Sequence, residues 1–255
     1  MDFLKLIEDI ILVQKYSLKN ASKSFIKNWP IVFTGFVYVT LNILAIIIIN
    51  TLFRGVLSLL AGVIFAIISS SLISNYLYLL SNIINSNRIT FQNFKDGFTY
   101  YLWEIYGVFF LIWLASYLLS AVSNLLGNQL DFLINILKIL ALIMLNALPE
   151  TIYQKNYSAQ ESILYAFNFI KENWINWLLP NIIFFAILYY LTDTIYTELF
   201  TIYVGLPGGI NIESIIRYII AQSIFSFMMI YRGYLFRLLS TSTRRKRMFM
   251  KNLYE

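Results

Sequence analysis

Two long apolar runs without a single charged residue constrain the fold of this chain more than any other feature. They cover residues 30–53 and 55–87, and only Arg54 lies between them. A helix that crosses a bilayer needs about 20 consecutive, mostly apolar residues. Of the 255 residues, 59% are hydrophobic and 13% are charged, whereas about 25% are charged in a soluble domain. The sequence therefore predicts an all-α, polytopic membrane protein.

The hydrophobic pattern predicts six transmembrane helices in three hairpins. The predicted spans cover residues 30–53, 56–82, 103–126, 132–149, 174–192 and 212–236. Residues 1–29 are expected to form an interfacial or cytoplasmic segment, residues 30–239 the transmembrane domain, and residues 240–255 a basic cytoplasmic tail. Residues 1–29 do not resemble a cleavable signal, because their apolar run from Ile10 to Val13 is too short.

A unit that occurs three times organises these spans. In each unit a short amphipathic stretch ends at or near a tryptophan, namely Trp29, Trp103 or Trp174, and two apolar segments follow. Apolar residues recur in these stretches at i, i+3, i+7 and i+11, as from Leu18 to Trp29, which is helical spacing. We therefore expect an amphipathic interfacial helix before each hairpin, anchored by its tryptophan.

Two roles are open for these interfacial stretches. They can set the depth and angle of the spans that follow them. Alternatively, residues 88–101 and 158–173 can form a docking surface, because cytoplasmic helices between spans contact the motor protein in six-span transporter subunits.

Basic residues indicate how the chain is oriented. In the predicted topology, 16 of the 19 Lys and Arg residues lie on the side that holds both termini. Cytoplasmic loops retain positive charge. Both termini are thus predicted to be cytoplasmic. The frequent use of Ile, Asn, Lys, Phe and Tyr suggests an AT-rich bacterial genome, so the expected location is the bacterial plasma membrane.

The sequence contains no histidine and no cysteine. Their absence excludes Ser-His catalysis, thiol chemistry, haem ligation by histidine and most transition-metal sites. P-loop and dinucleotide-binding motifs are absent too. We therefore expect a protein that is not an enzyme and has no cofactor and no metal.

Ionisable residues near or within the spans are candidates for functional sites. A polar stripe is predicted along the fourth span, formed by Asp131, Asn135 and Lys138, with Asn146 near its continuation. It can line a polar cavity, or Lys138 can extend to the headgroups while Asn135 bonds a neighbouring helix.

The other charged residues are expected to have ordinary roles. Glu150 and Glu104 lie at predicted cytoplasmic ends. Arg232 and Arg237 are expected to extend to the inner surface, and Glu213 and Arg217 are expected to pair.

In the second span, small and polar residues favour close helix packing over a substrate path; they are Gly62, Ala66, Ser69, Ser70, Ser71, Ser74 and Asn75. Glycines at 205, 208 and 209 mark turns in the outer loop, after a candidate re-entrant segment at 198–204.

The tail carries a cluster of basic residues just inside the last span. Arg244, Arg245, Lys246 and Arg247 are predicted to contact anionic lipid, at about 1 kcal/mol for each charge near the surface. Because the chain is a membrane protein, we expect this role and no nucleic-acid partner.

Residues around the end of the fourth span resemble a known family. Leu148-Pro149-Glu150, a polar stretch, and the run from Phe169 to Trp174 are similar to bacterial six-span proteins of the YciC type and to the membrane domain of some glycerophosphodiester phosphodiesterases. The resemblance implies an all-helical fold with no known reaction. We expect no soluble catalytic domain within these 255 residues and therefore no phosphodiesterase activity.

The sequence thus favours a non-enzymatic integral membrane protein that acts in membrane organisation, lipid handling or support of another complex. Membrane lipids are its expected partners. The alternative is the permease subunit of an ABC-type export or self-protection transporter, whose partner would be a cytoplasmic ATPase or another membrane subunit.

Overall fold

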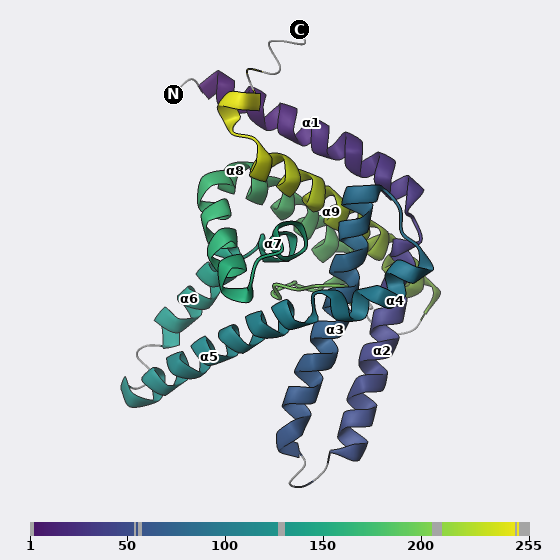
Figure 1. The fold of residues 1–255 in the computed structure, drawn as a ribbon, viewed down its shortest axis with the longest axis vertical. Coiled ribbons are helices and arrows are strands. Elements are labelled where there is room, and N and C mark those ends of the chain that lie inside the picture. The colour runs from purple at the N-terminus through teal and green to yellow at the C-terminus, as the bar shows by residue number, and fades with distance from the viewer. Residues whose placement is uncertain are drawn as a thin grey trace.

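The computed structural model describes residues 3–53, 55, 58–126, 131–205, 211–247 and 249. This part of the chain is helical and contains no strand. Its helices are α1 (Phe3–Lys27), α2 (Ile31–Leu52), α3 (Ser58–Ser86), α4 (Phe91–Tyr100), α5 (Leu102–Leu126), α6 (Asp131–Met144), α7 (Leu148–Lys155), α8 (Ala159–Thr192) and α9 (Ile212–Thr241) (Figure 1).

Six stretches of the described chain are long and apolar enough to cross a membrane. They are Ile31–Leu52, Leu60–Ser86, Leu102–Ser123, Phe132–Lys155, Ala159–Thr192 and Ile212–Thr241. The fold is thus all-helical and compatible with an integral membrane protein, as the sequence predicts. The predicted grouping into three repeated hairpins stays a prediction.

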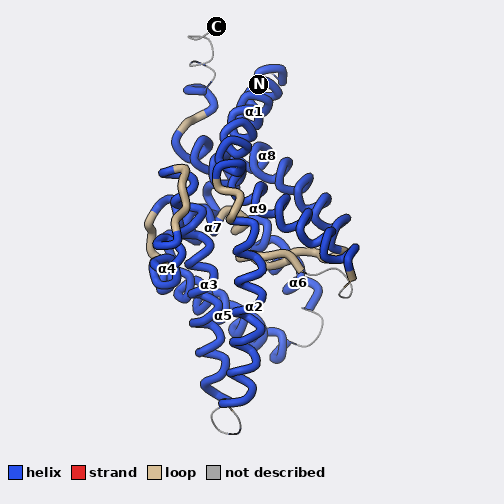
Figure 2. The backbone as a smooth tube through the Cα atoms, turned by 90° about the vertical axis from the view of Figure 1, so that its right-hand side faces the viewer, coloured by secondary structure: helices blue, strands red, loops and turns tan. Residues whose placement is uncertain are grey.

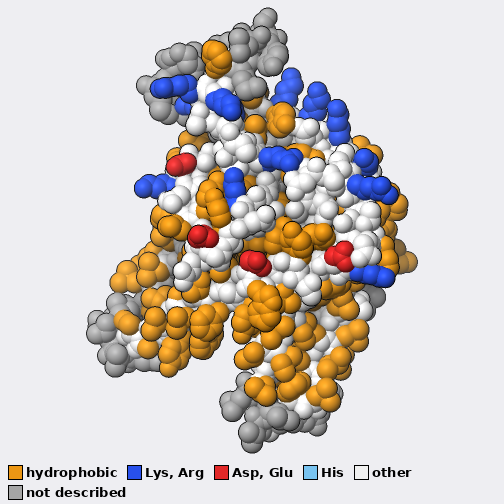
Figure 3. All heavy atoms as spheres, viewed as in Figure 1, with side chains coloured by type: hydrophobic (Ala, Val, Ile, Leu, Met, Phe, Trp, Pro, Cys, Tyr) orange, Lys and Arg blue, Asp and Glu red, His pale blue; other side chains and the backbone are white. Residues whose placement is uncertain are grey.

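The surface is divided between a basic end and apolar lobes. The pairs α2–α3 and α5–α6 project away from both termini, and their visible surface is apolar (Figures 1 and 3). Lys and Arg side chains gather at the opposite end, which holds α1 and the segment after α9 (Figure 3). We call this the basic end. Such segregation fits a protein with one part in hydrocarbon and one part among headgroups and water.

The fourth predicted span is interrupted in the structure. Helix α6 ends at Met144, residues 145–147 form a turn, and α7 begins at Leu148. Pro149 lies in the first turn of α7, where the missing N–H and fixed φ of proline are tolerated. Because of the turn at 145–147, residues 132–149 are not one continuous helix. At about 1.5 Å per residue, the 14 residues of α6 extend only about 21 Å.

Two predicted boundaries have clear backbone counterparts. Helix α8 is kinked at Asn173, whose φ of −121° and ψ of 15° are not helical, directly before the predicted fifth span. Helix α8 ends at Thr192, and the next residue, Asp193, has the left-handed backbone conformation that often follows a helix. The segment from Asp193 onward leads away from the helix. It then packs inward, because Phe200 and Val204 are buried and the Val204 N–H donates to Gln222 Oε1 at 3.0 Å. Residues 198–204 are not helical, and residues 206–210 lie outside the described residues.

The core lies where α1, α3, α7, α8 and α9 meet. Helix α9 is central, since it packs on α1, α2, α3, α7 and α8, and Figure 2 shows α1 lying along it. The largest fully buried side chains are aromatic and include Tyr76, Trp177 and Phe236. The core is therefore concentrated toward the basic end, whereas the projecting lobes keep most of their apolar side chains exposed.

Candidate binding cavity at the basic end

A cavity of about 760 Å³ opens at the basic end. Its walls come from α1, from α8 on both sides of its kink, from the end of α9 and from the segment that follows. The lining residues are Asp9, Ile10, Tyr165, Asn168, Phe169, Glu172, Asn173, Trp174, Ile175, Asn176, Leu239, Ser240, Thr241, Ser242, Thr243, Arg244 and Arg247. Its volume lies within the roughly 300–1,000 Å³ of ligand pockets, and its lining mixes aromatic, amide, hydroxyl and charged groups.

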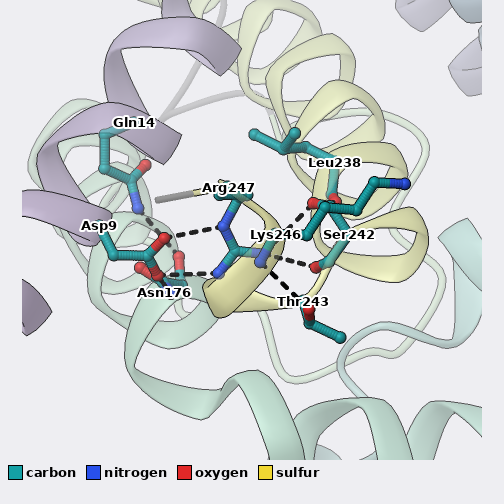
Figure 4. Close-up of polar contacts among 8 residues, drawn as sticks. All are labelled: Asp9, Gln14, Asn176, Leu238, Ser242, Thr243, Lys246 and Arg247. Carbon is teal, nitrogen blue, oxygen red and sulfur yellow. Dashed lines mark hydrogen bonds and ion pairs between the residues drawn. The ribbon is translucent and has the colours of Figure 1, made fainter. Parts of the chain in front are cut away.

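A buried ion pair forms one wall of this cavity. Arg247 Nε donates to Asp9 Oδ1 and Arg247 Nη2 donates to Asp9 Oδ2, both at 2.8 Å (Figure 4). Both side chains are more than nine-tenths buried. Arg247 Nη1 also donates to the Ser242 carbonyl at 2.6 Å. The two parallel bonds fix the guanidinium plane, so the pair holds the segment after α9 against α1.

A chain of polar side chains extends this pair into the helix interface. Asn176 of α8 donates to Asp9 Oδ2 at 3.4 Å, and Gln14 of α1 donates to the Asn176 carbonyl at 3.0 Å (Figure 4). The Tyr231 hydroxyl of α9 bonds Gln14 Oε1. Helices α1, α8 and α9 are thus joined around the cavity by hydrogen bonds, which are costly to leave unmade where the groups are buried.

The kink in α8 shapes the opposite wall. Asn173 leaves the helical conformation, and its side-chain amide donates to the Phe169 carbonyl at 3.1 Å. The backbone therefore bends between Phe169 and Trp174, both of which line the cavity. Trp174 itself is exposed, as expected of an aromatic residue at a membrane boundary.

A second buried ion pair lies behind this wall. Arg232 of α9 donates to both carboxylate oxygens of Glu150 in α7, at 2.7 and 2.9 Å, and to the Asn146 carbonyl at 2.6 Å. The Asn146 side chain accepts a bond of 2.9 Å from Trp177, whose ring lies 5.2 Å from the guanidinium carbon. Trp177 in turn contacts Phe169 edge-on at 5.3 Å between ring centroids. This pair connects α7, α8 and α9 next to the cavity.

These pairs correct the sequence interpretation of several charges. Arg232 does not extend to the surface, because its side chain is buried and paired with Glu150. Arg247 is not available to lipid, because it is buried against Asp9. The neighbouring Arg245 and Lys246 are exposed, and Arg244 lines the cavity.

The structure separates the residues of the predicted polar stripe. Asn135 and Lys138 lie on α6 with exposed side chains, and the side chain of Asp131 lies outside the described residues. Asn146 lies beyond the end of α6 and belongs to the Glu150–Arg232 cluster instead. The turn at 145–147 removes the continuous helical face on which the four-residue stripe depended.

Part of the small and polar set in the second span forms a helix interface with α4, whereas Gly62 is exposed with open space around it. Ser74 Oγ donates to the Gly97 carbonyl of α4 at 2.6 Å, and Ser71 Oγ donates to the Phe98 carbonyl at 2.8 Å. Asn75 Nδ2 bonds the Phe94 carbonyl. Because these groups bond the backbone of α4, they anchor it on α3. Trp29 and Trp103, the other predicted interfacial anchors, are exposed like Trp174.

Sequence reasoning missed Asp9 as a site residue and underestimated Glu150. One signal was available for Glu150: an acidic residue directly after an apolar segment is a site candidate in a membrane protein. Among the described residues, no cluster of acidic side chains able to hold a metal is present.

Comparison with known proteins yields no relative. No protein-family model matches the chain, and searches of curated proteins and of solved structures return no significant match. Functional interpretation therefore rests on the geometry of the cavity and on its position at the basic end.

Proposed function

We propose that this chain is a non-enzymatic integral membrane protein that binds the headgroup of a membrane lipid in the cavity at the basic end. In this proposal both termini are cytoplasmic and the protein resides in the bacterial plasma membrane. Of the roles that the sequence favoured, lipid handling is the one that the cavity supports best.

The mixed lining of the cavity is the observation that carries this proposal. Apolar walls from Phe169, Trp174 and Leu239 suit the glycerol and upper acyl region of a lipid, and the amide and hydroxyl groups suit a polar head. The cavity also lies beside Trp174, whose exposed ring is typical of the headgroup layer. An amphiphile would therefore find both kinds of surface in one place.

The charges of the lining define a class of headgroup. Since Asp9 and Arg247 neutralise each other, Arg244 and Glu172 are the further charged residues of the lining. A cation and an anion in one cavity fit a zwitterionic headgroup, with its phosphate near Arg244 and its ammonium near Glu172. Phosphatidylethanolamine has this chemistry.

The matched pair Arg244→Gln and Arg245→Gln tests the proposal. Both variants remove one positive charge from the same segment, but only Arg244 lines the cavity. Each protein is purified in mild detergent, and the phosphatidylethanolamine that remains bound is measured by native mass spectrometry. We expect R244Q to lose most of this lipid and R245Q to retain it. Equal retention by the two variants contradicts the proposal.

Filling the cavity provides an independent test. Asn168 and Leu164 are exposed residues one turn apart on α8, and only Asn168 lines the cavity. Asn168→Trp is expected to displace the bound lipid, whereas Leu164→Trp is expected to leave it in place. If both variants bind as much lipid as the unmodified protein, the headgroup lies elsewhere.

A second candidate function is the permease subunit of an ABC-type transporter. Helix α4 favours it, because this short helix is fixed on α3 yet leaves Phe91 and Tyr100 exposed. Substituting both residues with Ser is expected to release an ATPase that co-purifies from the native host after crosslinking. The absence of any ATPase in the purification from unmodified cells contradicts this alternative.

A further inference from the structure

A second, smaller cavity lies on the other side of the end of α9. Its volume is about 270 Å³, and α3, α7, α9 and the junction of α4 and α5 contribute to it. The lining residues are Ser81, Asn85, Tyr100, Tyr101, Tyr153, Gln154, Lys155, Asn156, Arg237, Ser240 and Thr241. Hydroxyl and amide side chains predominate, so this cavity suits a small polar group.

The charge of this lining has one sign. Lys155 and Arg237 are its charged residues, and both are basic; no acidic residue belongs to the lining. In the larger cavity, by contrast, each sign of charge is present. Two cations that share a small polar cavity favour an anion between them.

Neutral partners hold both cations in place. Arg237 Nη1 donates to the Ile84 carbonyl at 2.7 Å, and Arg237 Nη2 donates to Asn85 Oδ1 at 2.8 Å. Lys155 Nζ lies 5.3 Å from the centre of the Tyr165 ring. These contacts orient the side chains without cancelling their charge. The guanidinium keeps further N–H groups for an anion, and the ammonium group of Lys155 is a compact charge with several donors.

The Tyr101 hydroxyl is a neutral part of the lining whose hydrogen is used within the protein. The Tyr101 hydroxyl lies 3.3 Å from the Tyr153 carbonyl and 3.5 Å from Ser81 Oγ. Burial raises the pKa of Tyr101 to about 12, more than the bond with Ser81 lowers it. The shift reinforces the protonated form that tyrosine already has at neutral pH, so this hydroxyl adds no negative charge to the cavity.

We propose that this smaller cavity binds a phosphate group, with Arg237 and Lys155 as its charged ligands. Arg and Lys together are a frequent combination for phosphate recognition, the first through its planar fork and the second as a point charge. The phosphate can belong to a lipid headgroup or to a free phosphate ion. The two cavities share Ser240 and Thr241 of α9, but Arg237 and Lys155 line only the smaller one, so this inference does not depend on the function proposed for the headgroup cavity.

Binding of two probes to the full-length protein tests this site. Protein delipidated in a maltoside detergent is titrated with inorganic phosphate by calorimetry at constant ionic strength, and phosphatidylglycerol is added in a parallel native mass spectrometry experiment. We expect saturable binding of at least one probe. Binding of phosphate alone identifies the free ion as the ligand, and binding of phosphatidylglycerol alone identifies a lipid headgroup.

Paired variants separate this site from general surface charge. Lys155→Gln/Arg237→Gln is expected to weaken binding by more than about tenfold, because charge-assisted hydrogen bonds are lost. Lys19→Gln/Lys23→Gln removes two exposed charges from α1 at the same end and is expected to leave the affinity unchanged. If Arg237→Gln disturbs the fold, the Lys155→Gln variant alone decides, since the Lys155 ammonium lies over the Tyr165 ring and forms no ion pair within the described residues. Equal loss in the two double variants, or no saturable binding of either probe to the unmodified protein, overturns the proposal.

Discussion

Breaking the buried pair of Glu150 and Arg232 is expected to destabilise the fold more than any other single change of charge. The Arg232 side chain is 5% exposed, that of Glu150 is fully buried, and two hydrogen bonds of 2.7 and 2.9 Å join them. Replacing Arg232 by Met leaves a buried carboxylate without its cation and leaves the Asn146 carbonyl without its donor. Replacing Glu150 by Met leaves the guanidinium without its anion.

The magnitude follows from the cost of an unpaired buried charge. Each single substitution is expected to lower the free energy of unfolding by about 3–5 kcal/mol. For a chain of this size, that corresponds to a fall of roughly 6–20 °C in melting temperature. Because the double variant contains neither charge, it is expected to lose about 2 kcal/mol less than the sum of the single losses. Unfolding of the detergent-solubilised protein by SDS, followed by circular dichroism at 222 nm, measures each value.

An exposed ion pair on the same helix serves as the control. In α9, Arg217 Nη2 lies 2.7 Å from Glu213 Oε1, and the two side chains are 47% and 71% exposed, respectively. Arg217→Met is expected to cost less than about 1 kcal/mol, because solvent screens exposed pairs. If Arg232→Met costs no more than Arg217→Met, or if the single losses at 150 and 232 simply add, the buried pair does not hold α7 on α9 and this reasoning is refuted.

Three further predictions, the first with a matched control, concern contacts between helices and the exposed face of α6. Gly97→Ala is expected to loosen α4 by about 1–3 kcal/mol in SDS unfolding, since an added Cβ would lie 3.1 Å from the Asn75 backbone, whereas Gly62→Ala, with open space around it, is expected to be neutral or stabilising. Tyr38→Phe removes a hydroxyl that donates to Asn75 at 2.6 Å and is expected to cost about 1 kcal/mol in the same assay; no loss would mean that water replaces the bond. Lys138→Leu is expected to change neither stability nor lipid retention, because its side chain is exposed on α6, and a loss of bound lipid would instead favour the polar cavity along the fourth span.

Interactions within one helix could be predicted from the sequence, and interactions between distant segments could not. The pair of Glu213 and Arg217, four residues apart, was predicted from helical spacing and is confirmed. Arg232 and Glu150 are 82 residues apart, and Arg247 and Asp9 are 238 residues apart. No local spacing encodes such pairs. From the sequence, Arg232 is therefore expected to reach the headgroups as a long cation near a helix end, and Arg247 to contact anionic lipid as part of the basic cluster.

The division of the chain into apolar stretches can also be predicted from the sequence, because hydropathy depends on local composition. The kink at Asn173 lies one residue before the span that was predicted to begin at Trp174. The interruption at 145–147 was not foreseen, although Pro149 marks it. An apolar run of adequate length satisfies the criterion for a span whether or not a turn divides it, so hydropathy alone does not detect the break between α6 and α7.

Helix α1 shows why the buried face of a helix in such a protein is hard to identify. Of the predicted apolar stripe from Leu18 to Trp29, Ala21 is buried, but Leu18 and Trp29 are exposed. The buried face instead follows small and polar residues at three- or four-residue steps: Asp9, Val13, Ser17, Ala21, Ser24 and Asn28. Lipid is as apolar as leucine, so little is gained by burying leucine inside the protein, whereas polar groups gain partners there and small ones allow close approach. Packing faces in this chain are therefore better sought among small and polar residues, and the serine-rich face of α3 that holds α4 follows the same rule.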